Sequence, residues 1–291
     1  MNRVINFHDV HDKAWFEKVV LLLGKKYNFI SADDVEDFYY KSKTLNNACL
    51  ISVDDGDLTS FEVIYPIMKK HSVPGVFFVS PKICKRDGII NFWFQEIMNC
   101  DKRELTLYLE ETLNREIGDV PVKSILSKMP VDEIIDTIAK FKEANHIPFL
   151  PPQNMNEEHI KFIDSEGLVT IGAHTMTHPF LSSETDERSE SEIKDSLLDL
   201  ENILGHPIRC FAYPNGIPNE DFGKREINIL KNTKCKLAFS TQYRHFLKDD
   251  DPFSIPRLGI SCGSIYFIRM KLFLGNFYPM IKRLLTHNFE W

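Results

Sequence analysis

Two short motifs supply side chains that could bind a metal ion and move a proton. Residues 53–56 (Val-Asp-Asp-Gly) place two carboxylates side by side, and residues 174–178 (His-Thr-Met-Thr-His) place two imidazoles four positions apart. Imidazoles with this spacing can meet one metal ion from a single turn of backbone. Two histidines and one carboxylate with open coordination positions are the ligands of a catalytic zinc site rather than a structural one. The motifs therefore predict metal-assisted chemistry with a second carboxylate to spare.

A third motif could supply a hydrogen-bond donor. Residues 211–216 (Phe-Ala-Tyr-Pro-Asn-Gly) contain a proline and a glycine, which fix a turn that can aim a backbone N–H into a site. Each motif alone also has an ordinary interpretation, because Asp-Asp-Gly is a common turn and the two histidines could be unrelated loop residues. All three motifs directly follow predicted strands, and their joint occurrence favours one catalytic site.

The elements that must position these motifs alternate between strand and helix patterns. Residues 12–23 and 189–204 carry apolar side chains on one helical face. This alternation predicts an α/β fold with a largely parallel sheet or barrel, whose ligands bind beyond the carboxyl ends of the strands. Short runs rich in Val, Ile and Phe predict strands at residues 4–7, 49–53, 76–79, 168–171, 208–211, 237–239 and 255–260.

The alternation lapses between about residues 91 and 150, where a helical pattern predicts an inserted subdomain. Trp93, near its start, could offer a face to a sugar ring, although aromatic residues at this density more often pack in a core. At the other end of the chain, residues 264–285 are apolar but interrupted by four charges. We therefore expect one domain over residues 1–291, with the helical insertion and a C-terminal helical segment at about 262–291.

The composition excludes several classes of protein. The chain has 291 residues, of which 43% are hydrophobic and 26% charged, as expected for one large globular domain. Its 42 acidic and 35 basic residues include no long basic run, so nucleic acid is not an expected partner. The six cysteines contain no CxxC pair, which argues against a zinc knuckle. No phosphate-binding glycine motif occurs, which argues against nucleotide chemistry.

The three motifs, in their order along the chain, resemble those of the polysaccharide deacetylase family with the NodB homology domain (carbohydrate esterase family 4). The resemblance covers nearly the whole chain apart from the insertion and about the last thirty residues. It implies a distorted (β/α)7 barrel and a hydrolase that removes an N-acyl group, foremost N-acetyl, from an amino sugar. It also implies one divalent ion, Zn²⁺ with Co²⁺ or Ni²⁺ as alternatives, bound by Asp55, His174 and His178, with Asp54 as the general base.

The sequence departs from the family's usual pattern at two points. Phe211 stands where an arginine usually begins the third motif, and no late Leu-x-His motif supplies the usual general acid. In both departures the sequence resembles the branch of poly-N-acetylglucosamine deacetylases. In that branch an early histidine is the general acid, and His8 lies at the corresponding place here. Arg257 resembles a late arginine of that branch and could pair with Asp54, with a surface position as the alternative. The backbone N–H of Tyr213 is expected to stabilise the tetrahedral oxyanion.

The start of the chain gives an expectation about location and substrate. Residues 1–13 lack the basic segment and long apolar stretch of a secretory signal, and no run reaches about 18 uncharged apolar residues. We expect a cytoplasmic protein without a transmembrane segment, with peripheral membrane contact as a weaker alternative. The expected substrate is then an N-acylated amino sugar that is nucleotide-linked or lipid-linked before export, rather than a finished extracellular polymer.

Two other functions are compatible with the same residues. A hydrolase of another non-peptide C–N bond, such as a formamide or a small cyclic amide, would use the same fold and the same metal chemistry. A catalytically silent carbohydrate-binding protein would keep the fold but lose Asp54, a metal ligand or His8. All of these residues are present in the sequence, which favours an enzyme.

Overall fold

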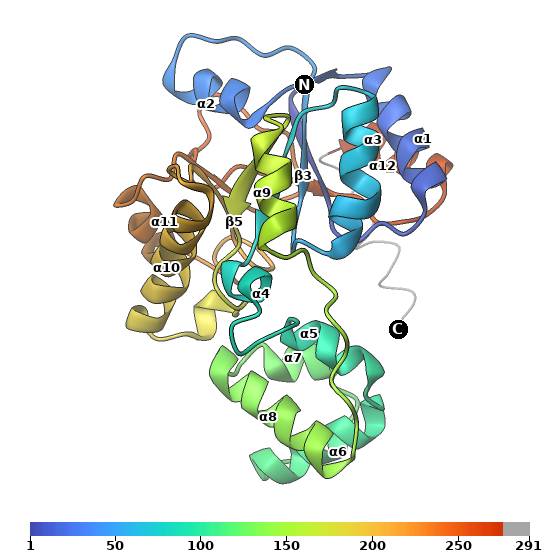
Figure 1. Ribbon diagram of the computed structural model, residues 1–291, viewed down its shortest axis with the longest axis vertical. Coiled ribbons are helices and arrows are strands. Elements are labelled where there is room, and N and C mark those ends of the chain that lie inside the picture. The colour runs from blue at the N-terminus through green and yellow to red at the C-terminus, as the bar shows by residue number, and fades with distance from the viewer. Residues whose placement is uncertain (276–291) are drawn as a thin grey trace.

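The computed structural model describes residues 1–275, which form a curled parallel sheet surrounded by helices (Figure 1). The strands follow the order β7-β6-β5-β4-β3-β1-β8, and β2 pairs with β3 beside this path. The strands are β1 (Arg3–Phe7), β2 (Asn28–Phe29), β3 (Ala48–Val53), β4 (Gly75–Val79), β5 (Val169–Ala173), β6 (Cys210–Ala212), β7 (Leu237–Phe239) and β8 (Leu258–Gly259).

The two edges of the sheet are joined by the segment that leads into β8. The N–H of Ile255 donates to the carbonyl of Ala238 in β7 at 2.8 Å, and the N–H of Ser240 donates to the carbonyl of Ile255 at 2.8 Å. A few residues later, Leu258 pairs with Ile5 of β1. The sheet therefore curls until its edges share one segment, which confirms the distorted (β/α)7 barrel of the NodB type that the resemblance implied.

Alternate residues of the strands enter two apolar cores. Every residue of β1, β3 and β4 is buried, as expected for parallel strands that are covered on both faces. Ile51 and Val53 of β3 lie in the outer core, which the helices cover. Leu50 of β3 lies in the inner core with Phe78 and Phe239, whose ring centroids are 5.3 Å apart. The strands are thus packed on both faces, and this packing holds their carboxyl ends in place.

Helices cover the outer face of the barrel, and α2 (Ala32–Tyr40) covers the inner core. The predicted helix at residues 12–23 is confirmed as α1, which starts after the N-cap Asp12 and buries the five apolar residues of the predicted face. The predicted helix at 189–204 is confirmed and starts three residues earlier. The outer helices are α1 (Lys13–Gly24), α3 (Tyr65–Lys70), α4 (Pro81–Lys85), α9 (Glu157–Ser165), α10 (Asp186–Leu204) and α11 (Lys224–Lys231).

Two strands differ from expectation for local reasons. The strand β2 has only two residues, which is too short for an alternating pattern to reveal. The run at residues 255–260 was expected as one strand, but it pairs with β1 only over Leu258–Gly259. Pro256 has no N–H and cannot continue a ladder of hydrogen bonds, so the run changes partner from β7 to β1 around it.

The helical region after β4 forms an apolar core of its own, centred on Leu109, Leu126, Ile134 and Phe141. In Figure 1 it lies below the barrel. We propose residues 91–150 as the bounds of this insertion. Its elements are α5 (Trp93–Glu96), the 3-10 turn η2 (Ile97–Asn99), α6 (Lys102–Leu113), α7 (Val122–Leu126) and α8 (Val131–Ala144).

The last helix within residues 1–275 is α12 (Ile265–Leu274), whose last turn receives a hydrogen bond from the buried Arg3 to the Leu272 carbonyl at 3.0 Å. The helical segment predicted at about 262–291 extends into residues 276–291, which lie outside the described residues. Within residues 1–275, no helix is both long and apolar enough to cross a bilayer.

Gly172 in β5 allows the close approach of two neighbouring strands just before the second motif. A Cβ atom there would lie 2.6 Å from the ring of Phe78 and 2.9 Å from the carbonyl oxygen of Cys210. Overpacking of this kind costs about 1–3 kcal/mol, so Gly172→Ala should lower the free energy of unfolding in urea by that amount. Gly259→Ala is the control, because its Cβ would meet no atom of the described chain within 4 Å. Equal stability of the two variants would contradict this account.

Candidate active site

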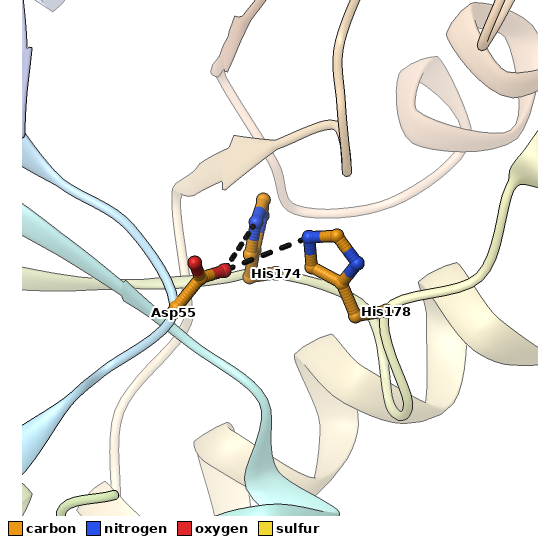
Figure 2. A group of neighbouring side chains, drawn as sticks. All are labelled: Asp55, His174 and His178. Carbon is orange, nitrogen blue, oxygen red and sulfur yellow. Dashed lines mark ion pairs between the residues drawn. The ribbon is translucent and has the colours of Figure 1, made fainter. Parts of the chain in front are cut away.

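The side chains of Asp55, His174 and His178 converge beyond the carboxyl ends of β3 and β5 (Figure 2). The Oδ1 atom of Asp55 lies 3.4 Å from Nε2 of His174 and 3.5 Å from Nε2 of His178. One ligand atom from each residue falls within 4.8 Å of the others, which is close enough for a single ion. Asp55 reaches this point because the strand has ended, and its φ of 67° turns the chain before Gly56. Left-handed backbone at residues other than glycine is typical of functional sites.

The donor atoms of this group fit a bound cation. Nδ1 of His174 lies 2.8 Å from the Ala212 carbonyl, which fixes the proton on Nδ1 and leaves the Nε2 lone pair directed at Asp55. Burial lowers the pKa of His178 to about 4, so its imidazole is neutral and keeps a lone pair. Oδ1 of Asp55 is buried without a hydrogen-bond partner among the described residues. Such atoms are rare in folded proteins, and a cation between the three residues would satisfy this one.

The loop that carries the two histidines is held by Glu192 of α10, which the sequence analysis did not identify. One carboxylate oxygen of Glu192 accepts from the N–H groups of Met176 and Thr177, each at 2.9 Å. The other accepts from the Thr177 hydroxyl at 2.8 Å. The loop contains left-handed backbone at Thr175 (φ 62°) and His178 (φ 59°). Because this conformation is strained, the buried Glu192 carboxylate stabilises the geometry that brings both imidazoles to one side.

Replacing Glu192 with alanine should weaken metal binding without removing a ligand. Groups that orient the ligands of a metal typically contribute about 10–100-fold in affinity, and we expect a loss in this range from a competition titration with a chelator. Glu190→Ala on the same helix is the control, because Glu190 is exposed and pairs only with Lys194 among the described residues. If the two variants bind Zn²⁺ equally tightly, Glu192 has no positioning role.

Asp54 is the centre of a buried polar network. Arg257 binds it with two hydrogen bonds, at 2.6 and 2.9 Å, and Nδ2 of Asn6 donates to it at 3.0 Å. Arg257 is only 1% exposed, so it is not a surface arginine. Burial alone would raise the pKa of Asp54, but the charge of Arg257, with help from two nearby histidines, outweighs it and holds the pKa below its usual range. The carboxylate is therefore ionised at neutral pH.

Asn6 links this network to the sheet, and it too was not identified from the sequence. Its Oδ1 accepts from Arg257 at 3.1 Å and from the hydroxyl of Ser52 at 2.8 Å. Arg257 also donates to the Ser240 carbonyl at 3.1 Å. Asn6 and Ser52 are opposite residues in the β1–β3 pairing, so the register of these strands determines the position of the carboxylate.

His8 follows the last residue of β1 and is half exposed, with 51% of its side chain accessible. Its Nε2 lies 3.9 Å from Oδ2 of Asp54, which is too long for a hydrogen bond. His8 and Asp55 line a cavity of about 490 Å³, together with Phe94, Gln95 and other residues of the insertion. The structure thus brings His8 and Asp54 to the same edge of the barrel as the three candidate metal ligands, which are Asp55, His174 and His178.

Tyr213 follows β6, and its side chain is fully buried. The phenol donates to the Phe253 carbonyl at 2.9 Å and its ring stacks on Phe222 with centroids 3.6 Å apart. The backbone N–H of Tyr213 donates to the Phe239 carbonyl at 3.2 Å, which is at the long end of the range for this bond. The N–H predicted to face an oxyanion is therefore engaged by β7 in this structure.

The wall of the cavity that the insertion supplies is held by a buried ion pair. Lys142 of α8 is fully buried, pairs with Glu96 of α5 and donates to Oδ1 of Asn99 at 3.0 Å. Glu96 also accepts from Asn91 at 2.7 Å and from the N–H of Leu150 at 3.1 Å. Asn99 and Leu150 both line the cavity, so this pair ties α8 to its wall. Removing one partner of a buried ion pair destabilises a protein strongly, because the other charge is left buried without a partner.

Trp93 supports the histidine loop from the insertion side. Its indole N–H donates to the carbonyl of His178 at 3.0 Å, and its ring packs against Phe94 and Phe180. The side chain is buried and does not line the cavity beside His8. Trp93 is therefore a core residue, as its aromatic neighbours suggested, and Phe94 is the aromatic residue that faces the cavity.

Comparisons with known proteins show the family and the fold of the chain. The polysaccharide deacetylase family matches residues 41–235, which is more than half of the chain, whereas no curated protein sequence matches it. Among solved structures, IcaB from Ammonifex degensii is similar with 19% identity and a TM-score of 0.60, covering 89% of this chain and 91% of that one.

Two further structures have the same fold. The Streptococcus pyogenes deacetylase PplD in complex with acetate has 15% identity and a TM-score of 0.59, covering 89% of this chain and 92% of that one. The de-N-acetylase from Aggregatibacter actinomycetemcomitans has 17% identity and a TM-score of 0.59, covering 93% and 99%. The chain therefore belongs to the polysaccharide deacetylase family and is a hydrolase of the carbohydrate deacetylase class, acting on carbon–nitrogen bonds.

Proposed function

We propose that this protein removes an N-acyl group, foremost N-acetyl, from an amino sugar with the help of one divalent ion. The observation that carries the proposal is the convergence of Asp55, His174 and His178 within 4.8 Å, beside an ionised Asp54. A ligand set of two imidazoles and one carboxylate leaves positions open for water and substrate, as in catalytic metal sites. The match to the family supports the reaction class.

The ion would be held by Oδ1 of Asp55 and Nε2 of the two histidines. Zn²⁺ is the first choice for this set of donors, with Co²⁺ and Ni²⁺ as alternatives. When bound, the ion would lower the pKa of a water molecule toward roughly 7 and polarise the acyl oxygen. The insertion covers one side of His178, since Phe94 contacts its ring edge-on with ring centroids 4.9 Å apart.

Asp54 is proposed as the general base that accepts a proton from the attacking water. Its carboxylate is ionised and cannot rotate freely, because Arg257 and Asn6 hold both oxygens. Fixed orientation favours a base that must meet a small nucleophile in one geometry. Arg257 is therefore proposed as a residue that orients Asp54 and keeps its carboxylate ionised, rather than as one that contacts substrate.

His8 is proposed as the general acid that protonates the departing amine. It lies on the cavity beside Asp54, and its half-exposed ring can meet a substrate that enters from solvent. An imidazole is the side chain that most often donates a proton near neutral pH in enzymes. Nε2 of His8 lies 3.9 Å from Oδ2 of Asp54, so the proposed acid and base are neighbours but are not hydrogen-bonded to each other.

The backbone N–H of Tyr213 is proposed as an oxyanion donor. In this role it would share its hydrogen with the oxyanion and the Phe239 carbonyl, or leave that carbonyl as the substrate enters. The present bond, at 3.2 Å, is longer than the usual length of about 2.9–3.0 Å of such bonds. The developing negative charge would be a stronger acceptor than a neutral carbonyl.

A cytoplasmic location, with peripheral membrane contact as an alternative, and a carrier-linked sugar remain part of this proposal. The test of the reaction is a panel of amino sugars with N-acetyl or N-formyl groups, free as well as nucleotide-linked and lipid-linked, incubated with metal-stripped protein before and after Zn²⁺ is restored. We expect acetate release that depends on metal. Release of formate alone would assign the protein to another C–N bond, and silence despite stoichiometric metal binding would favour a carbohydrate-binding role.

A further inference from the structure

A groove on the insertion adjoins the cavity at the candidate metal site. It has a volume of about 750 Å³, and Phe94 and Met98 line both the groove and the cavity beside His8. Phe94 also contacts the ring of His178. The two spaces are therefore neighbours on either side of these two side chains. A ligand that reaches past Phe94 and Met98 would have its sugar beside Asp55 and the rest of the molecule in the groove.

The groove has an apolar lining that is open to solvent. Met98 is 79% exposed, Leu107 is 54% exposed and Val120 is 48% exposed, and further apolar lining comes from Ile97 and Leu105. Single exposed apolar residues are ordinary on a protein surface, but several of them along one concave groove mark a place where apolar groups bind. The lining predicts that the part of the ligand that enters the groove is hydrocarbon.

Three cations stand among these apolar residues. Lys102 and Arg103 come from the start of α6 and Lys123 from α7, and none of them forms an ion pair within residues 1–275. The groove also contains Glu110, whose carboxylate already accepts from two backbone N–H groups at 2.8 and 3.2 Å, and Asp119. The cations are therefore in excess, and the groove offers positive charge beside apolar surface.

We propose that this groove binds the phosphate-linked lipid carrier of the substrate, which makes the substrate an N-acylated amino sugar joined through phosphate or diphosphate to a prenyl-type chain. The inference rests on the proposed function, because the sugar must lie at Asp54 and the metal ligands. Lys102, Arg103 and Lys123 would contact phosphate oxygens, for which a guanidinium and ammonium groups are suited. The hydrocarbon would cover the apolar lining and remove it from water.

A nucleotide carrier suits this groove less well than a lipid carrier. Recognition of a base usually requires stacking on an aromatic ring or hydrogen bonds to amide side chains. Among the residues that line the groove, the one aromatic side chain is Phe94, which also faces the sugar cavity, and there is no asparagine or glutamine. The groove thus offers a phosphate and hydrocarbon site without a place for a base.

The experiment measures binding of farnesyl diphosphate, inorganic diphosphate and uridine diphosphate to the metal-loaded full chain by calorimetry. The groove variant combines Lys102→Gln, Arg103→Gln and Lys123→Gln. The control variant combines Lys13→Gln, Lys18→Gln and Lys25→Gln, which removes the same charge from exposed positions on or next to α1. Both variants retain every proposed metal ligand, so any binding of diphosphate by the ion is common to them.

We expect farnesyl diphosphate to bind the groove variant at least about tenfold more weakly than the parent, since each charge-assisted hydrogen bond is of this order. The control variant should keep the affinity of the parent within about twofold. Uridine diphosphate and inorganic diphosphate should bind the parent at least about tenfold more weakly than farnesyl diphosphate, because they lack the hydrocarbon.

Equal affinity of farnesyl diphosphate for the parent and the groove variant, or no binding to the parent, would overturn the proposal. Uridine diphosphate binding as tightly as farnesyl diphosphate would overturn the lipid carrier in favour of a nucleotide. Acetate release by the parent from soluble N-acetyl sugars reports separately on the proposed function, because these sugars do not occupy the groove. The carrier site and the deacetylase reaction can therefore fail independently.

Discussion

Replacing Asp54 with asparagine should leave one divalent ion bound and reduce acetate release about 10²- to 10⁴-fold, the contribution expected of a general base. The amide cannot accept a proton from water, whereas Asp55 and the two histidines are unchanged. The measurement is the rate of acetate release at saturating Zn²⁺, with bound metal determined on the same sample. A parent-like rate in Asp54→Asn would show that another group is the base.

This variant also has a predicted cost in stability, which must be measured beside its activity. Asparagine would leave the buried Arg257 guanidinium without a carboxylate, and breaking a buried pair costs about 3–5 kcal/mol. Urea denaturation should detect this loss, and activity is compared under conditions in which the variant is folded. Asp195→Asn is the matched control, because Asp195 is exposed on α10, and it should change neither quantity.

Replacing His174 with alanine should abolish both metal binding and turnover. This imidazole is one of three proposed protein donors, and the hydrogen bond of its Nδ1 to the Ala212 carbonyl directs Nε2 at Asp55. The loss of affinity should exceed the approximately 10–100-fold expected when a residue that only orients a ligand is removed. Equilibrium dialysis with Zn²⁺ measures the affinity, and acetate release measures the turnover.

His206→Ala is the matched control for this prediction. His206 lies on the surface, where it pairs with Asp164, and it should retain full metal binding and activity. If His174→Ala binds one ion as tightly as His206→Ala does, the three converging side chains are not the metal site. The pair of variants thus separates a specific ligand from a general effect of removing an imidazole.

The strands and the ends of strands could be predicted because their signals are local. Runs of Val, Ile and Phe revealed seven of the strands within a few residues, and the motifs were recognised as turns that follow them. In a parallel sheet the carboxyl ends of strands lie at one edge, so Asp55 and the histidine motif were expected to meet although they are more than one hundred residues apart in sequence.

The residues that hold the site in place could not be predicted in the same way. Asn6 and Ser52 become partners only through the register of β1 against β3, and Glu192 reaches the histidine loop from the middle of α10. Lys142 reads as an ordinary charged helix residue, yet it is buried against Glu96. Each of these contacts depends on packing between distant elements, for which a single sequence carries no periodic signal.

The cavity and the groove illustrate the same limit for substrate recognition. The helical pattern of the insertion was visible in the sequence, but its placement against His178 depends on Trp93 and Phe94, which read as core residues. Because the insertion supplies part of the cavity wall and all of the residues that line the groove, the fold alone does not determine which sugar enters. Substrate choice in this protein is therefore expected to lie in the insertion.

One bound ion is proposed to activate hydrolysis in this site. In the experiment, metal-stripped protein is titrated with Zn²⁺, and bound metal and the rate of acetate release are followed together, with the best substrate of the panel. We predict that the rate rises in proportion to bound metal and becomes constant at one ion per chain. Acetate release that is independent of metal, or that stays absent with one ion bound, would contradict the account.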